Sequence, residues 1–186
     1  YWDRSAESTQ DKYMGNITNG ADLYDFEGYK IYRATDFEFN DAYNITDGDG
    51  NPTFLEPYVQ NGIRAQWDLV DGKSGWHPVD LNGIKFYLGD DTGLTHSYVD
   101  HNVVNGQRYY YAVVSYDYGG DLSNNIIPSD SPMKLRVNPL TGAVSLGPNV
   151  VEVVPSPPSA GFVDASFAGD QVDHVLGASS GEVFLE

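Results

Sequence analysis

The segment from Asn105 to Asp117 constrains the fold of this chain more than any other. It begins with an Asn-Gly turn and continues as a run of aromatic and β-branched residues, which favours a β-strand. Alternate residues of such a strand can face one core, and one such set is Tyr109, Tyr111, Val113 and Ser115. With Val103 a short turn upstream, the segment predicts a tyrosine corner, in which the first ring is buried and its hydroxyl bonds loop backbone.

Further segments, taken with this one, resemble a fibronectin type III domain. In that comparison residues 25–33 look like strand C, residues 94–100 like strand E, residues 109–117 like strand F and residues 133–137 like strand G. The sequences of these segments, and those of residues 48–52 and 66–72, are similar to the sequences of modules in large secreted and cell-surface proteins of Bacteroidetes-like bacteria. Those proteins are associated with type IX secretion. The resemblance implies an all-β, immunoglobulin-like β-sandwich outside the cell, and it implies no catalytic residues.

The chain departs from that family pattern in two places. Trp2 looks like the core residue that ends strand B, so strand A is missing from the pattern. The sandwich is then a piece of a longer protein, or it is completed by a strand from elsewhere. Residues 36–93 form a long insertion between strands C and E, whose aromatic content indicates short strands and ordered loops. The expected core contains Trp2, Tyr29, Ile31, Tyr109, Tyr111 and Val113.

The composition changes sharply after Val137, because no Lys or Arg occurs from there to Glu186. We therefore expect a sandwich domain at residues 1–137. Residues 138–186 are expected to be a linker and the start of a second β-module, or a strand-donating tail, and residues 181–186 read as a strand. Alternate valines of an extended segment can fill the groove of an open sandwich. The predicted assembly strand contains Val150, Val151, Val153 and Val154.

Charge and cysteine content exclude several classes of function. The net charge is −17, from 27 acidic and 10 basic residues, and such a field repels nucleic acid and anionic membrane surfaces. No cysteine is present, so disulfides, thiolate catalysis and cysteine zinc sites are excluded. No segment is apolar for the length that a membrane crossing needs. The four histidines show no metal-binding spacing, and they are His77, His96, His101 and His174.

One loop has the beginning of a calcium-binding pattern. Asp47, Asp49 and Asn51 place oxygen-bearing side chains at alternate positions of a Gly-rich loop, and calcium takes about six to eight oxygen ligands. Further oxygens can come from elsewhere in the fold, from Glu56, Asp90 and Asp91. The alternative is an ordinary Asp/Gly turn, because the loop lacks the full EF-hand pattern. No other cofactor is expected.

The insertion also carries a set of aromatic residues with two interpretations. They can form a platform on which a sugar ring stacks, or they can fill the small core that the insertion builds against the sandwich. The set contains Tyr58, Trp67, Trp76 and Tyr87.

Two functions of different class follow. The first is a non-enzymatic extracellular structural module, a subunit or segment of a surface filament, sheath or layer that assembles by β-strand pairing with other copies or neighbouring β-modules. The alternative is a carbohydrate- or ligand-binding accessory or adhesion module of a larger exported protein. An enzyme is not expected, since neither a nucleophile elbow nor a phosphate-cradling loop occurs in the sequence.

Overall fold

The computed structural model describes residues 1–20, 23–81, 83–123 and 125–161. The strands lie in antiparallel sheets and few residues are helical, so the chain is an all-β protein, as the sequence predicts. It divides into two compact units, Tyr1–Ser156 and Pro157–Glu186. His174 and the strand expected at 181–186 lie outside the described residues. Within the described ranges, every helix is too short or too polar to span a bilayer.

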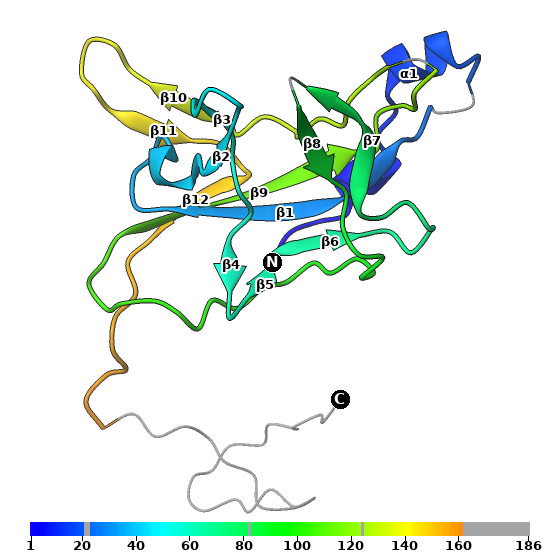
Figure 1. The fold of residues 1–186 in the computed structure, drawn as a ribbon. Coiled ribbons are helices and arrows are strands. Elements are labelled where there is room, and N and C mark those ends of the chain that lie inside the picture. The colour runs from blue at the N-terminus through cyan, green and yellow to red at the C-terminus, as the bar shows by residue number, and fades with distance from the viewer. Residues whose placement is uncertain (21–22, 82, 124, 162–186) are drawn as a thin grey trace, which may run out of the picture. The chain divides into compact units, whose positions relative to one another are not determined.

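A four-stranded antiparallel sheet is the frame of the first unit (Figure 1). Its two central strands pair almost throughout, from Gly28 opposite Tyr116 to Ala34 opposite Tyr110. Both are rich in tyrosine and β-branched residues, which suit a pleated surface. The strand order is β12 (Val150–Val153), β9 (Tyr109–Asp117), β1 (Phe26–Ala34) and β6 (Gln66–Asp68).

Among the described residues, four two-stranded sheets and three short helices surround this frame. The insertion expected at residues 36–93 forms three of those sheets and also contributes β6 to the frame, so it is built of short strands as predicted. The hairpins are β2 (Ile45–Thr46) with β3 (Pro52–Phe54), β4 (Val59–Gln60) with β5 (Ile63–Arg64), β7 (Trp76–Leu81) with β8 (Ile84–Tyr87), and β10 (Leu135–Val137) with β11 (Val144–Leu146). The helices are η1 (Ser5–Ser8), α1 (Lys12–Ile17) and η2 (Asn40–Ala42).

Three expectations from the resemblance need correction. Residues 94–100 form no strand, and this segment instead accepts the backbone N–H of Trp2 at the carbonyl of His96. Leu135–Val137 pairs with β11, and the place beside β9 belongs to β12. Because β12 completes the frame, the compact unit extends past the boundary expected at residue 137 and ends at Ser156.

The two faces of the frame are covered unequally. The side chains of β9 that point to the better covered face are all buried, and they are Tyr110, Ala112, Val114 and Tyr116. The set that the sequence assigns to the core is the opposite one, and it is buried only at Tyr109, while Tyr111, Val113 and Ser115 are half-buried. Alternation reveals two faces of a strand without deciding which one the rest of the chain covers.

The hydroxyl of Tyr109 makes the predicted bond of a tyrosine corner. It accepts the backbone N–H of Val104 at 3.0 Å, and the ring is buried. Tyr29 and Ile31 are also buried, whereas Trp2 is half-buried and packs its ring 5.8 Å from that of Tyr29. This cluster covers part of the second face of the frame.

Candidate functional site

The four aromatic residues predicted as a platform lie in two separate places. Trp76 and Tyr87 face each other across the β7–β8 hairpin, with ring centroids 5.0 Å apart and planes at 65°. Trp76 is 61% exposed. A tryptophan left this open is informative, because large aromatic side chains are mostly buried.

Trp67 and Tyr58 pack on the opposite face of the frame. The ring centroid of Trp67 lies 5.6 Å from that of Tyr98. The Tyr58 hydroxyl donates to Asp100 at 3.2 Å, and the Arg33 guanidinium lies 3.9 Å from its ring centroid. These two residues therefore take the packing role, which is one of the two interpretations that the sequence allows.

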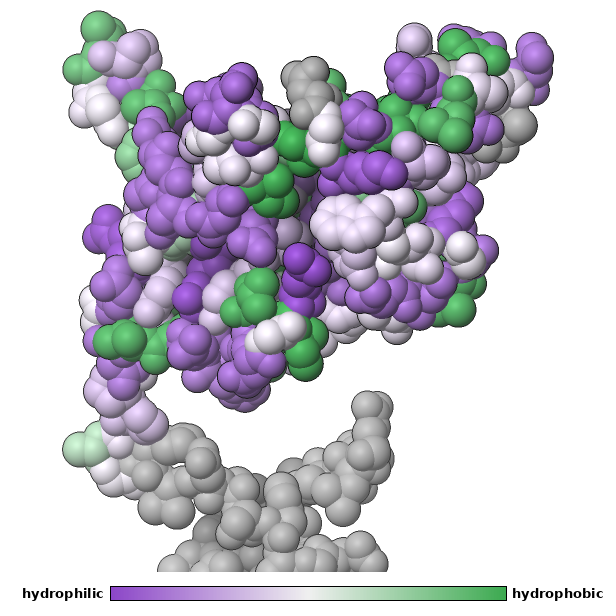
Figure 2. Space-filling view, viewed as in Figure 1, coloured by the Kyte–Doolittle hydropathy of each residue, from purple (hydrophilic) through white to green (hydrophobic). Residues whose placement is uncertain are grey.

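A groove of about 540 Å³ lies beside Trp76 and Tyr87. We call it the hairpin groove. Its walls come from β8 and from residues 54–57, and it opens on the face of the molecule drawn in Figure 2. Its floor is formed by side chains of the frame and of the segment that follows β9. They are Lys30, Tyr32 and Gln66 from the frame and Asp130 from that segment.

The floor of the hairpin groove holds a paired charge. The ammonium of Lys30 lies 3.0 Å from Oδ1 of Asp130, and the Tyr32 hydroxyl donates to the other carboxylate oxygen. The same ammonium sits 3.5 Å from the ring centroid of Phe86. Burial lowers the pKa of Lys30, and the charge of Asp130 opposes that effect. The floor is thus polar and held in one geometry.

The rim of the hairpin groove combines aromatic rings with cations. The guanidinium of Arg64 lies 5.1 Å from the ring centroid of Tyr87. The Tyr87 hydroxyl donates to Asp90, and this bond raises the pKa of Tyr87. Lys85 stands two residues before Tyr87 on β8, so both side chains point to the same side of the hairpin.

This arrangement has the form of a ligand site. Such sites are concave and mainly apolar, with a few polar groups at fixed positions. The exposed ring of Trp76 can stack on the apolar face of a sugar, and the polar groups beside it can bond hydroxyls. Sequence reasoning missed the floor. Lys30 carried a weak signal, a charge inside an apolar strand, whereas Asp130 comes from a loop that no pattern connects to it.

The loop predicted to bind calcium uses its carboxylate within its own turn. Oδ1 of Asp47 accepts the backbone N–H groups of Asp49 at 3.0 Å and Asn51 at 2.8 Å. Hydrogen bonds from Asn51 lower the pKa of Asp47. The other predicted ligands lie elsewhere. Glu56 lines the hairpin groove, Asp90 accepts the Tyr87 hydroxyl, and Asp91 accepts the N–H of Gly72 at 2.8 Å.

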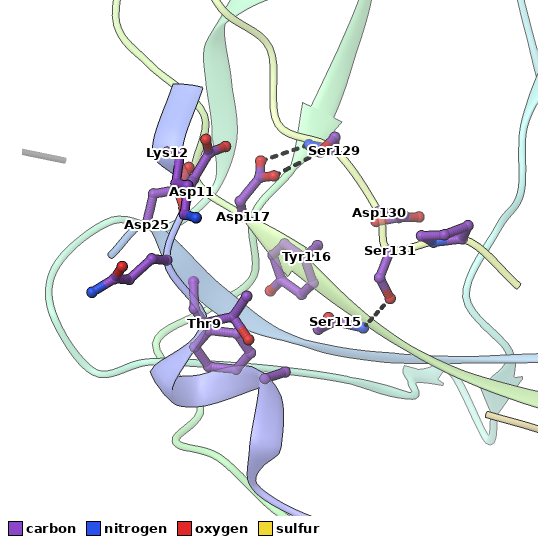
Figure 3. A pocket seen from close by; sticks show the side chains of 14 residues that line it. Thr9, Asp11, Lys12, Asp25, Ser115, Tyr116, Asp117, Ser129, Asp130 and Ser131 are labelled. Carbon is purple, nitrogen blue, oxygen red and sulfur yellow. Dashed lines mark hydrogen bonds between the residues drawn. The ribbon is translucent and has the colours of Figure 1, made fainter. Parts of the chain in front are cut away.

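A different set of acids converges in the structure. Asp11, Asp25 and Asp117 bring carboxylate oxygens within 4.8 Å of one another (Figure 3). Asp117 also accepts the N–H and the hydroxyl of Ser129 at 2.7 and 2.6 Å, and burial raises its pKa. Oxygen ligands at this spacing are what a hard divalent cation takes. The three residues come from distant segments, which is why no sequence pattern reveals them.

Glu27 is a buried acid of a different kind. Its side chain is fully buried on β1, and neither carboxylate oxygen has a hydrogen-bond partner among the described residues. Burial raises the pKa of Glu27 to about 8, and the negative charges of Asp71, Asp68 and Asp91 add to the effect. Glu27 therefore carries a proton at neutral pH in the folded protein.

Each of the described histidines has its own surroundings, and no two of them share a contact partner among the contacts given below. Nε2 of His77 lies 2.7 Å from the carbonyl of Gly120 in a fully buried site, and Nε2 of His96 lies 2.5 Å from the Glu7 carboxylate. His101 is exposed. These contacts account for the first two as packing and surface residues.

The predicted assembly strand is already paired inside its own chain, which corrects its assignment as a free donor. Val150 is buried opposite Ala112 of β9. β12 is nevertheless an edge strand of the frame, and two of its valines and the valine that follows it are exposed: Val151 by 51%, Val153 by 39% and Val154 by 50%. A groove of about 870 Å³ runs beside it over Val113 and Tyr111.

Comparison of the chain with protein-family models, with curated proteins and with solved structures finds no match. The assignment of a function therefore rests on the geometry of the hairpin groove and of the β12 edge.

Proposed function

We propose that this chain is a non-catalytic carbohydrate-binding module and that the hairpin groove is its binding site. The observation that carries the proposal is the position of Trp76, which is 61% exposed at the rim of a groove of about 540 Å³. Of the two functions considered from the sequence, this is the one for which the groove supplies a concave surface of suitable size.

The geometry of the hairpin supports binding by stacking. Trp76 is held in an edge-to-face contact with Tyr87, and such contacts contribute about 0.5–1.5 kcal/mol beyond burial. The Trp76 ring therefore loses little conformational freedom when a ligand covers it. A rigid aromatic surface gives binding energy at low entropic cost.

Binding rather than hydrolysis is proposed because of how the floor is arranged. Of the two carboxylates that line the groove, Glu56 and Asp130, the second is engaged by both Lys30 and Tyr32. A glycosidase needs two carboxylates on either side of the bond that it cleaves, one of them protonated as the acid. The paired Asp130 suits orientation of a hydroxyl better than proton transfer.

The test is binding to an array of polysaccharides. The unmodified chain is expected to retain at least one glycan, and Trp76→Ala is expected to weaken that binding about tenfold or more, the effect of a lost stacking ring. Tyr13→Ala is the matched control, since Tyr13 is 65% exposed but lies on α1, away from the groove. Equal binding by Trp76→Ala and the unmodified chain would refute the proposal.

A second candidate function is supported by the edge of the frame. The exposed valines of β12 present an apolar strand edge, which is a template for a strand of another chain. This is the structural-module hypothesis with β12 as the acceptor rather than the donor. Deleting residues 148–186 would remove a strand of the frame, so a loss of assembly in that variant would not distinguish a lost interface from an unfolded domain.

Charge placed on the strand edge is the better test of assembly. Val151→Lys and Val153→Lys replace two exposed apolar side chains of β12 with charged ones, and they leave the backbone pairing of β12 with β9 in place. Native polymers seen by electron microscopy should be lost in these variants if the edge joins subunits. Unchanged polymers, or dispersed particles of the unmodified chain, would count against assembly through β12. The extracellular location and a larger exported parent stay predictions.

A further inference from the structure

We propose that the ligand of the hairpin groove is a carboxylated polysaccharide, one that contains uronic acid residues. This inference rests on the proposed function and names the class of glycan for the same site. Three features support it: the concentration of basic side chains in the groove, their lack of acidic partners at the rim, and their position around the exposed aromatic pair.

Basic residues are scarce in this chain and gather in the groove. The chain has 10 basic and 27 acidic residues, yet the hairpin groove is lined by three basic side chains and two acidic ones. One of the three, Lys30, is paired with Asp130 on the floor. The remaining charged side chains of the lining are two basic ones at the rim, Arg64 and Lys85, and one acidic one, Glu56. The lining therefore carries a small excess of positive charge although the whole chain has a net charge of −17, and this excess favours an anionic ligand.

The two rim cations are not engaged in ion pairs. Neither Arg64 nor Lys85 lies within 4.0 Å of a carboxylate among the residues that the structure describes. Asp80 is the cross-strand neighbour of Lys85, but its Oδ1 accepts the N–H of Gly83 at 2.9 Å and closes the hairpin turn. Both cations are exposed, so they can bind a carboxylate without breaking an existing pair.

The cations stand around the aromatic pair. Arg64 lies against the ring of Tyr87, and the ring of Tyr87 lies against that of Trp76. Lys85 shares the side of β8 on which Tyr87 points. A sugar ring stacked on Trp76 therefore lies beside a tyrosine that is itself in contact with a cation. Residues from β5, β7 and β8 thus form one surface that can contact both a sugar ring and its carboxylate.

This juxtaposition favours a uronate over other anions. A nucleic acid carries its negative charge on backbone phosphates, which are separate from the stacking faces of its bases. A uronic acid offers a carboxylate and an apolar ring face on the same small unit. The arginine fork matches a carboxylate in a bidentate geometry.

The experiment compares acidic polymers with their neutral counterparts. Polygalacturonate and alginate are each tested beside the same polymer after its carboxyl groups have been reduced to alcohols, together with neutral β-glucans. The unmodified chain is expected to bind at least one acidic polymer, to lose at least about tenfold in affinity on carboxyl reduction, and to bind more weakly as salt rises.

Charge variants locate the effect in the groove. Arg64→Gln with Lys85→Gln is expected to weaken binding to the acidic polymer about tenfold or more. Lys12→Gln with Arg136→Gln removes the same charge from exposed positions outside the hairpin groove, and it should leave binding within about twofold. Thermal unfolding of both double variants verifies that each is folded.

The outcomes separate this inference from the proposed function. Binding to neutral glycans alone, lost in Trp76→Ala, would overturn the uronate inference and retain the carbohydrate-binding function. Equal loss in the two double variants would show a general charge effect and would also overturn it. Binding to none of the polymers would overturn both proposals.

Discussion

Lys30 and Asp130 are 100 residues apart in the chain, and their ammonium and carboxylate lie 3.0 Å apart on the floor of the hairpin groove. Only 6% of the Lys30 side chain is exposed, against 27% of that of Asp130. The pair joins β1 to the segment that follows β9, and it fixes the floor against which Phe86 of β8 packs.

Breaking this pair from either side is predicted to destabilise the protein unequally. Asp130→Asn leaves a buried ammonium without a counter-charge and should cost about 3–5 kcal/mol of unfolding free energy. Lys30→Met leaves a partly exposed carboxylate that still accepts from Tyr32, and it should cost only about 1–3 kcal/mol. Urea unfolding of both variants and of the double variant measures the coupling. Additive losses would contradict the pairing.

Glu27 is predicted to make stability depend on pH. Its pKa is about 8 in the folded protein against an ordinary value of 4.5, so the folded state holds a proton that the unfolded state releases between these values. Stability due to this group therefore falls as pH rises from about 4.5 to 8. Glu27→Gln should change Tm little at pH 4.5 and raise it by about 5–10 °C at pH 9. A Tm difference that does not vary with pH would rule this out.

Gly89 is predicted to be irreplaceable because of Asp68. A Cβ at Gly89 would lie 2.3 Å from Oδ2 of Asp68, and the φ angle of Gly89 is 138°. That carboxylate also accepts the N–H groups of Asp91 and Thr92 at 2.6 and 2.8 Å, so it cannot move away freely. Gly89→Ala should cost about 3 kcal/mol or more.

The control for this substitution is Gly62→Ala. Gly62 has a φ of 80°, and nothing lies within 4 Å of an added Cβ. The only cost there is that of holding alanine in the left-handed backbone conformation, about 1–2 kcal/mol of unfolding free energy. Similar losses in the two variants, measured by chemical denaturation, would show that Asp68 does not crowd Gly89.

Tyr109→Phe tests the tyrosine corner. The substitution removes only the hydroxyl that accepts the N–H of Val104 at 3.0 Å. We expect a loss of about 1 kcal/mol, the net value of such a bond, together with faster amide exchange at Val104. Tyr13→Phe, at an exposed position on α1, should have no measurable effect. Unchanged stability and exchange in the Tyr109 variant would mean that the bond does not hold the loop.

The sequence predicted features that depend on neighbouring residues. β1 and β9 are long runs of tyrosine and β-branched residues, and their strand character follows from that local pattern. The bond between Tyr109 and Val104 spans five residues, so its signal is also local. The all-β class follows from the same strands and from the many Gly-containing turns.

Features that join distant segments were mispredicted or missed. Alternation along β9 revealed two faces, and the coverage by η2 and the β10–β11 hairpin decides which one forms the core. The strand at 150–153 was recognised, but its pairing with β9 was not. Of the aromatic set, Trp76 stays exposed while Trp67 is half-buried against Tyr98, although both read alike in sequence.

By itself the sequence determined the all-β class, the two long strands, the strand at residues 150–153 and the strongly acidic charge of this protein. Only the tertiary structure decided that Trp76 and Tyr87 meet Arg64, and that Lys30 meets Asp130. The physical reason is range. Strand propensity and turn chemistry act over a few neighbouring residues, whereas a binding groove depends on which distant segments the whole chain brings together.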